Sequence, residues 1–409
     1  MQINKVAVVG AGTMGAGIAQ VAAQEGFEAI LLDISEPIVR QGIERIDKNL
    51  SRSVEKGRLT SAGKDQVLQR VHAATQMEEV GDAGLVVEAI FEDPTAKSDI
   101  FRRLDSICPP ETIFATNTST LSVTRLAGAV SRPDRFLGLH FFNPVPVMRL
   151  VEVIPGLRTS EQTVRLAIDL TRAIKKAPVR AADCPGFLVN RILMPYAGEA
   201  MLAAQEGAAT PTEIDEALKK AGFPMGPLAV NDMVGIDVGL HTFPILCEGY
   251  GERFPFPLLF ERLCKAGRLG AKSGKGIYAD GKVDQEFLGI IRQIQEETGI
   301  SHTQFSHERL ILRQVNEAVY CLQERIATAE DIDRAMVLGT GFPADQNGVG
   351  GPLHWADEMG LDLVLEKLEH YNKTLGQRFL PHFLLKQYVA AGYLGRKAKR
   401  GFFEYPDPT

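Results

Sequence analysis

The chain has 409 residues, which corresponds to about two to four domains at the usual size of roughly 100–200 residues per domain. Lys and Arg number 45 and Asp and Glu number 51, and the formal net charge of −6 argues against a general nucleic-acid-binding protein. Hydrophobic residues make up 45% and charged residues 23% of the chain, which excludes a disordered protein.

The cysteine count and the apolar runs bear on location. Five cysteines are an odd number, and none lies in a C-x-x-C pair, so we expect reduced thiols with no disulfide framework and no bound metal. Glycines interrupt the apolar start of the chain, and no apolar run is long enough for a membrane-spanning helix. These features predict a cytoplasmic protein, with a cleaved organellar leader left open as an alternative.

The first 33 residues contain the clearest local motif. Residues 6–9 are a β-branched run that predicts a buried parallel strand. The run leads into the glycine turn at 10–15, a helical pattern that ends near Gly26, a second strand over 29–32, and Asp33. Strand, glycine turn, helix, strand and acid follow each other in the order that a dinucleotide-binding βαβ unit requires.

Each residue of this motif has a physical task. Gly10 allows a tight turn, Gly12 lets the backbone approach a pyrophosphate, and Gly15 lets the helix pack closely on the strand. The helix N-terminus presents N–H groups and a positive dipole end to the phosphates. Asp33 can accept hydrogen bonds from both ribose hydroxyls and would repel a 2′-phosphate, so the motif predicts NAD in preference to NADP.

The rest of the first half alternates strands and helices. Residues 85–90, 113–116 and 136–139 predict further strands, which gives an α/β fold with a Rossmann-type dinucleotide-binding domain over 1–184. Residues 34–80 have a polar helical pattern that predicts two helices projecting from the sheet. The basic residues there form either a solvated helix pair or a contact for a phosphorylated ligand.

The second half is predicted to be helical and contains an internal repeat. Past Pro185-Gly186 the strand pattern stops, and Leu269-Gly270-x-Lys272-x-x-x-Gly276 recurs as Leu394-Gly395-x-Lys397-x-x-x-Gly401. Further matched pairs lie 118 or 125 residues apart: Arg191 with Arg309, Glu199 with Glu317, Asp215 with Asp333, Asp232 with Asp357, and Gly235 with Gly360. The repeat predicts two all-helical domains related by duplication, over 185–285 and 300–409, joined by a polar segment near 296–307.

Polar residues gather where predicted strands end. His140 ends the run 136–139, and Asn117-Thr118-Ser119 follow another strand, so both should reach the carboxyl edge of the sheet, where open α/β sheets bind ligands. Glu152 follows an apolar pair, and a carboxylate beside a histidine can fix its tautomer and stabilise its cation. The alternative is that His140 is a hydrogen-bonded core residue with no chemical role.

Five motifs follow each other along the chain: GAGTMGAGIAQ (10–20), VVEAIFE (86–92), NTSTL (117–121), HFFNPVPVM (140–148) and PGFLVNR (185–191). In this order they resemble the NAD-dependent L-3-hydroxyacyl-CoA dehydrogenases of fatty-acid metabolism, including 3-hydroxybutyryl-CoA dehydrogenases. The resemblance covers residues 1 to about 280, and some longer relatives carry a second helical copy, as this chain does.

The resemblance implies a role for each matching residue. His140 would be the general base, Glu152 its charged partner, and Ser119 and Asn190 the groups that position the substrate's 3-oxygen and carbonyl. Lys56, and less surely Arg52 or Asn49, would meet the coenzyme A part of the substrate. The residues implied to contact NAD are Gly10, Gly12, Thr13, Met14, Gly15, Asp33, Glu92, Lys97, Asn117, Asn143 and Lys272.

The second helical copy departs from the family pattern. It lacks the Pro-Gly-Phe-x-Val-Asn motif, and Glu308 stands where the first copy has Asn190. It therefore cannot form a second active site of this kind. Single-copy relatives dimerise through the helical domain, so we expect the second copy to pack on the first in cis and the protein to be a monomer or a homodimer.

Two other functions compete with an acyl-CoA dehydrogenase. One keeps the chemistry but takes a free sugar acid, as in L-gulonate dehydrogenases, and the basic residues of the projecting helices argue for coenzyme A instead. The other is a catalytically silent NAD-binding protein. The presence of His140, Glu152, Ser119 and Asn190 together argues against it, because a silent protein has no chemical need for all four.

Overall fold

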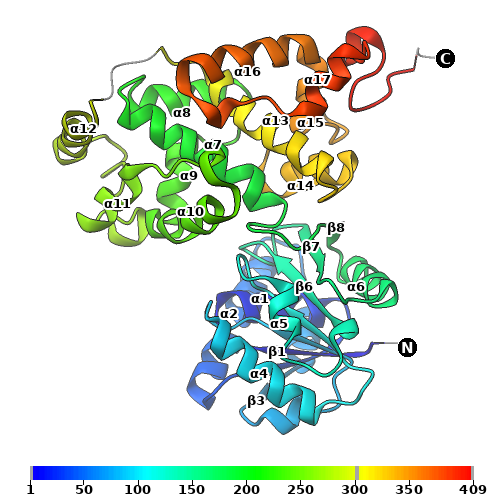
Figure 1. The fold of residues 1–409 in the computed structure, drawn as a ribbon. Helices are drawn as coiled ribbons and strands as arrows, with labels where there is room; N and C mark the ends of the chain where they lie inside the picture. The colour runs from blue at the N-terminus through cyan, green and yellow to red at the C-terminus, as the bar shows by residue number, and fades with distance from the viewer. Residues whose placement is uncertain (1–2, 300–303, 407–409) are drawn as a thin grey trace. The chain divides into compact units, whose positions relative to one another are not determined.

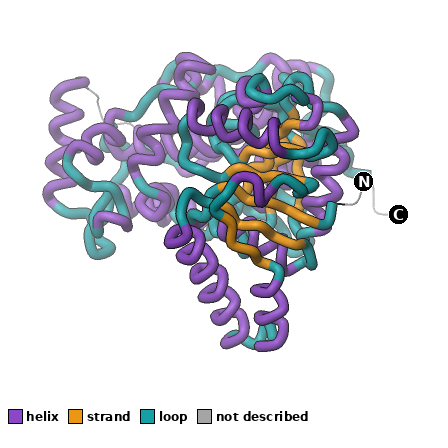
Figure 2. Tube along the Cα trace, turned by 90° about the horizontal axis from the view of Figure 1, so that it is seen from below, coloured by secondary structure: helices purple, strands orange, loops and turns teal. Residues whose placement is uncertain are grey.

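Eight strands form one sheet in the computed structural model, which describes residues 3–299 and 304–406 (Figure 2). They are β1 (Lys5–Val9), β2 (Glu28–Leu32), β3 (Val71–Ala74), β4 (Leu85–Glu88), β5 (Ile113–Thr116), β6 (Phe136–Phe141), β7 (Leu150–Pro155) and β8 (Ala177–Arg180). Their order is β3-β2-β1-β4-β5-β6-β7-β8, and neighbours are parallel except for the antiparallel pair β6–β7. Chain order reverses at β1, between β2 and β4, which is the switch point where such sheets bind ligands.

Helices connect these strands in the first unit, Met1–Phe187 (Figure 1). They are α1 (Thr13–Gln24), α2 (Glu36–Glu55), α3 (Ser61–Gln69), α4 (Pro94–Ile107), α5 (Val123–Ala127) and α6 (Glu161–Ala173). Side chains fix where several of them begin. Asp93, for example, accepts a hydrogen bond from Ala96 N at 2.7 Å in the first turn of α4, and Pro94 supplies the first helical residue.

The α/β fold that the sequence predicts is confirmed, but three strands were missed. The helical pattern over 34–80 gives α2 and α3 but was wrong for Val71–Ala74, which form the edge strand β3. Only the first and last residues of β3 are buried, so it lacks the apolar run that marks a central strand. β7 and β8 were also not predicted, although β7 is buried over most of its length.

The second unit, Leu188–Thr409, is helical. Its first run is α7 (Val189–Gln205), α8 (Pro211–Lys220), α9 (Pro227–Val234), α10 (Ile236–Tyr250), α11 (Leu258–Lys265) and α12 (Gln285–Thr298). Its second run is α13 (His307–Gln323), α14 (Ala329–Thr340), α15 (Pro352–Met359), α16 (Leu361–Leu375) and α17 (Phe383–Ala390). Within the part of the chain that the structure describes, no helix is long and apolar enough to span a membrane.

The two helical runs make the same internal contacts at the repeated residues. The half-buried carboxylate of Asp232 accepts hydrogen bonds from Ile277 N and Tyr278 N, both at 2.8 Å. Asp357 does the same for Phe402 N and Phe403 N, both at 3.0 Å. Each aspartate thereby ties a late loop to the helix pair α9–α10 or α15–α16. The repeated sequence thus specifies a repeated tertiary contact.

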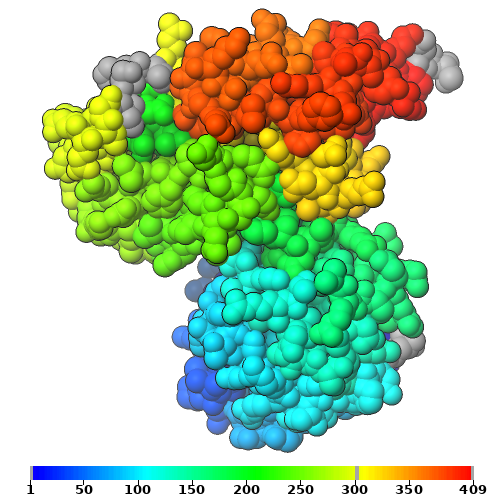
Figure 3. Space-filling model, in the orientation of Figure 1, coloured from blue at the N-terminus to red at the C-terminus, as the bar shows by residue number. Residues whose placement is uncertain are grey.

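The second run packs on the first through α7 and α13. In Figure 3 the second run, coloured yellow to red, lies against the first, coloured green. Arg191 Nε of α7 lies 2.7 Å from Glu317 Oε1 of α13, and Arg309 Nε of α13 lies 2.6 Å from Glu199 Oε1 of α7. All four side chains are buried. Arg191 aligns with Arg309 and Glu199 with Glu317 in the repeat, so each copy gives an arginine to the other copy's glutamate. The exchange is that of a two-fold symmetric pair.

Candidate active site

The glycine turn between β1 and α1 has no room for side chains at two positions. Gly10 has φ of 109°, and a Cβ there would lie 2.6 Å from the carbonyl oxygen of Ala89. A Cβ on Gly15 would lie 1.7 Å from the carbonyl oxygen of Gly10. Both positions therefore require glycine, and together they bring the start of α1 close to the end of β1.

Gly12 differs from these two positions because it faces open space. A Cβ there would meet no described atom within 4 Å, so a ligand can approach the backbone at the N-terminus of α1, which includes Thr13 and Met14. Asp33, just after β2, accepts a hydrogen bond from Ala11 N at 2.7 Å, which holds its carboxylate against this turn. Open backbone N–H groups beside a carboxylate fit the pyrophosphate and ribose of NAD.

His140 and Glu152 are joined by the pairing of β6 and β7. They lie directly opposite each other in the antiparallel ladder, on the same face of the sheet. His140 Nδ1 is 2.6 Å from Glu152 Oε2, and the two side chains are 6% and 0% exposed. Glu152 thus orients the imidazole of His140.

Aromatic rings surround the imidazole of His140. The ring centroids of Phe142 and Phe187 lie 4.6 and 5.9 Å from that of His140. Among residues 3–299 and 304–406, Nδ1 is the only ring nitrogen of His140 with a hydrogen-bond partner, which leaves Nε2 to exchange a proton with a ligand.

A second polar segment, residues 117–120, follows β5. Asn117 Oδ1 accepts a hydrogen bond from Phe141 N at 2.9 Å, next to His140. Ser119 N donates to Glu92 Oε1 at 2.9 Å, and Thr118 Oγ1 donates to the same oxygen. The strand β5 and these bonds bring the segment that carries Ser119 to the same sheet edge as His140.

Glu92 and Lys97 are in contact at this edge of the sheet. Glu88, which the sequence analysis did not select as a candidate, also contacts Lys97. Lys97 Nζ lies 2.6 Å from Glu88 Oε1 and 3.2 Å from Glu92 Oε2, and the Lys97 side chain is 1% exposed. Burial raises the pKa of Glu92, but Lys97 and the hydrogen bonds from Thr118 and Ser119 outweigh it and hold that pKa below its usual value. The sequence feature that could have identified Glu88 is a carboxylate within the apolar strand predicted over 85–90.

The remaining predicted residues are more exposed or belong to the other unit. Asn143 is exposed just after β6, and Lys56 is exposed at the end of α2. Lys272 forms an ion pair with Asp237, and Asn190 is in the first turn of α7. Because Asn190 and Lys272 lie in the second unit, their approach to His140 and the glycine turn stays a prediction.

Arg52 and Asn49, the two less certain candidates for coenzyme A, are on the last turns of α2. Arg52 is exposed, whereas Asn49 Nδ2 donates to Gln20 Oε1 on α1 at 3.2 Å. No group of three or more metal-ligating side chains occurs among the residues that the structure describes.

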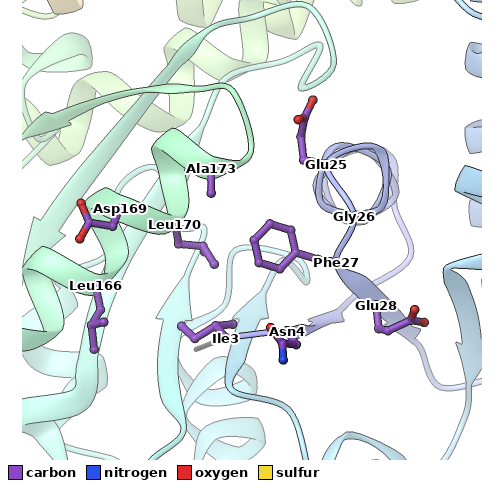
Figure 4. A pocket seen from close by; sticks show the side chains of 10 residues that line it. All are labelled: Ile3, Asn4, Glu25, Gly26, Phe27, Glu28, Leu166, Asp169, Leu170 and Ala173. Atoms are coloured by element: carbon purple, nitrogen blue, oxygen red, sulfur yellow. The ribbon is translucent and has the colours of Figure 1, made fainter. Parts of the chain in front are cut away.

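A hollow on the first unit lies away from this chemistry. It has a volume of about 600 Å³ and lies between α6 and the turn from α1 to β2, where the strands begin (Figure 4). Phe27 and Leu170 form its apolar walls, and Glu25, Glu28 and Asp169 lie at its rim. His140 and Ser119 lie at the opposite, carboxyl edge of the sheet, so this pocket is not the candidate active site.

Comparisons with known proteins agree with the fold and the glycine turn. Residues 5–184 match the family described as 3-hydroxyacyl-CoA dehydrogenase, NAD binding domain. Residues 186–280 and 305–405 match 3-hydroxyacyl-CoA dehydrogenase, C-terminal domain. The helical half thus matches the same domain family twice.

Individual relatives cover nearly the whole chain. The fatty acid oxidation complex subunit alpha of Shewanella amazonensis is 38% identical over 96% of this chain, and the chain spans 56% of that protein. The crystal structure of 3-hydroxybutyryl-CoA dehydrogenase from Escherichia coli K12 gives a TM-score of 0.86 at 32% identity, covering 96% of this chain and 100% of the other.

A shorter relative matches less of the chain. (S)-3-hydroxybutyryl-CoA dehydrogenase from Ralstonia eutropha is 41% identical with a TM-score of 0.67, and it covers 69% of this chain and 100% of its own. The chain spans about half the length of the curated relatives it matches. It belongs to the 3-hydroxyacyl-CoA dehydrogenase family, whose members are NAD-dependent oxidoreductases.

Proposed function

We propose that this protein catalyses the reversible, NAD-dependent oxidation of an L-3-hydroxyacyl-CoA to the 3-oxoacyl-CoA. The observation that carries the proposal is the buried pair His140–Glu152 at the carboxyl edge of a dinucleotide-binding sheet. The printed names of the relatives refer to fatty acid oxidation and to 3-hydroxybutyryl-CoA, and we assign this chain the same class of substrate.

His140 acts as the general base. Its Nε2 takes the proton of the 3-hydroxyl as C3 becomes a carbonyl carbon, and Glu152 at Nδ1 stabilises the imidazolium that forms. Such a proton transfer contributes about 10²–10⁴-fold to the rate. Bound NAD supplies the acceptor for the hydrogen that leaves C3 with its electron pair.

Other residues orient the two ligands. Ser119 and Asn190 position the 3-oxygen and the thioester carbonyl, and Lys56 meets the coenzyme A phosphates, with Arg52 and Asn49 as less certain contacts. NAD is held by the glycine turn with Thr13 and Met14, by Asp33, and by Glu92, Lys97, Asn117, Asn143 and Lys272. The open backbone at Gly12 and the carboxylate of Asp33 beside it support this assignment.

We also propose a domain organisation of one NAD-binding domain, 1–184, and two helical copies, 185–285 and 300–409. The reciprocal pairs Arg191–Glu317 and Arg309–Glu199 support packing of the second copy on the first in cis. Because that packing covers one face of the first copy, the protein is a monomer or a homodimer formed through another face.

The test is NADH oxidation with acetoacetyl-CoA, followed by NADH absorbance. Parallel reactions contain free acetoacetate, L-gulonate with NAD, and NADPH in place of NADH. Turnover confined to the thioester and NADH is the expected result. Turnover of L-gulonate alone would replace the substrate class with a sugar acid. Absence of all turnover, despite NADH binding, would contradict the proposed activity.

A further inference from the structure

A buried chain of charges connects the centre of the sheet to the segment that carries Ser119. Glu88, the last residue of β4, is fully buried, and its Oε2 accepts a hydrogen bond from Thr116 Oγ1 of β5 at 2.7 Å. Its Oε1 accepts from Ile90 N at 2.8 Å and from Lys97 Nζ at 2.6 Å. Glu88 is thus fixed to the neighbouring strand β5 and to the backbone after β4, and it holds the ammonium of Lys97.

Lys97 connects Glu88 to Glu92. Its Nζ also lies 3.2 Å from Glu92 Oε2, so one buried ammonium bridges two carboxylates. The other oxygen of Glu92 accepts hydrogen bonds from Ser119 N at 2.9 Å and from Thr120 N at 3.2 Å. Glu92 therefore holds the backbone N–H groups of Ser119 and Thr120, and Lys97 holds Glu92 in place.

The position of Lys97 argues for this role. At 1% exposure its ammonium is enclosed by protein, and Glu88 at 0% exposure is deeper still. A buried ammonium with two carboxylates is a costly arrangement that persists only where its geometry is satisfied. Here it connects the end of β4 to the turn that carries Ser119.

We infer that Glu88 is a positioning residue for catalysis, which acts through Lys97 and Glu92 to fix the Ser119 turn at its distance from His140. The inference rests on the proposed function, because it takes Ser119 to be a substrate contact. Glu88 is fully buried, so in this inference it acts through these residues and not by contact with a ligand. Asn117, bonded to Phe141 N beside His140, holds the other end of the same segment.

Kinetic measurements on Glu88→Gln, Lys97→Met and the double variant test this inference. If the chain positions Ser119, each single variant lowers kcat at saturating NADH and acetoacetyl-CoA by about 10- to 100-fold, because a shift of about 1 Å in a positioned group can cost this much. In Glu88→Gln the dissociation constant of NADH should change by less than about threefold, which is within about 0.7 kcal/mol, whereas Lys97→Met also removes a proposed NAD contact. The effects should not add in the double variant, because both residues belong to one chain of contacts.

A control variant and an exchange measurement distinguish displacement of the Ser119 turn from other causes of a lower kcat. Arg102→Met, which removes an exposed cation from the same helix α4, is the matched control and should leave kcat unchanged. Hydrogen–deuterium exchange of a peptide covering 117–121 should be faster in Glu88→Gln and Lys97→Met than in wild type or in Arg102→Met. This readout does not depend on turnover.

Three outcomes overturn the inference. The first is a Lys97→Met variant with weak NADH binding but normal kcat at saturation, since Lys97 would then be a cofactor contact alone. The second is additive effects of the two substitutions, and the third is unchanged exchange at 117–121. If Lys97→Met does not fold, Glu88→Gln and the double variant, which removes one charge of each sign, still decide the matter. Failure of wild-type turnover with every substrate would contradict the proposed function instead.

Discussion

Buried charges in the two units of this protein have different surroundings. In the first unit, His140–Glu152 and Glu88–Lys97 lie at the carboxyl edge of the parallel strands, where the proposed function places the ligands. In the second unit, Arg191–Glu317 and Arg309–Glu199 are as deeply buried but lie between the helices α7 and α13. The chemical pairing is similar in both, so position must decide what each pair does.

This difference in position distinguishes charged pairs with a catalytic role from charged pairs with a structural role. A pair at a sheet edge can exchange a proton with a ligand or orient a group that touches one. A pair between two helices can only hold them together, and its removal leaves an uncompensated buried charge. Substitutions in the first unit should therefore change turnover more than stability, and those in the second unit stability more than turnover.

The largest expected effect is on the helix–helix pairs. Arg309→Met removes the cation that lies 2.6 and 2.7 Å from Glu199 and Glu206. Because Arg378 still bridges both carboxylates, the free energy of unfolding should fall by about 3 kcal/mol, the low end for a broken buried pair. Urea denaturation measures this, and turnover of the folded fraction should be near normal. Arg334→Met removes an exposed cation from α14 and is the control. A loss no greater than in this control would contradict the structural role.

Substitution of His140 tests whether a buried charged pair of the first unit affects turnover more than stability. A glutamine at this position can still donate a hydrogen bond to Glu152 but cannot accept the substrate proton and become a cation. His140→Gln should lower turnover by at least about 10²-fold, the low end for a general base. NADH affinity, measured by fluorescence titration, and the melting temperature should change little. Near-normal turnover would exclude His140 as the base.

Asp33 tests the cofactor side of the first unit. Asp33→Ala removes a charged hydrogen-bond acceptor, which should weaken NADH binding by about tenfold or more. Because the repulsion of a 2′-phosphate is lost as well, discrimination against NADPH should fall. Asp169→Ala on α6, an exposed carboxylate of the same unit, should bind both cofactors as wild type does. An unchanged ratio of NADH to NADPH affinity would show that Asp33 does not contact the ribose.

The smallest expected effect is on two equivalent ion pairs, one in each helical copy. Lys272–Asp237 in the first copy and Lys397–Asp362 in the second are equivalent ion pairs beside Gly235 and Gly360. These lysines are about half exposed, so Lys272→Met and Lys397→Met should each cost less than about 1 kcal/mol of stability. Only Lys272→Met should also weaken NADH binding. Equal NADH affinity in both variants would make Lys272 a purely structural residue.

The sequence by itself determined the features that depend on neighbours along the chain. The glycine turn at 10–15 and Asp33 specify a βαβ unit because turn geometry, helix start and strand end are all local. The duplication could also be read directly, because Asp232 and Asp357 stand in matching sequence surroundings. A short edge strand such as β3 escaped because its few buried residues make no apolar run.

Tertiary structure decided which distant residues meet. The contact between His140 and Glu152 depends on the register of β6 with β7, and a slip of one residue would send one of these side chains to the other face. Lys97 meets Glu88 and Glu92 only because α4 folds back over the end of β4. Arg191 and Glu317 lie far apart in the sequence, and only the packing of α7 on α13 joins them. Local sequence contains no information about such pairings, because burial across the sheet and between helices sets them.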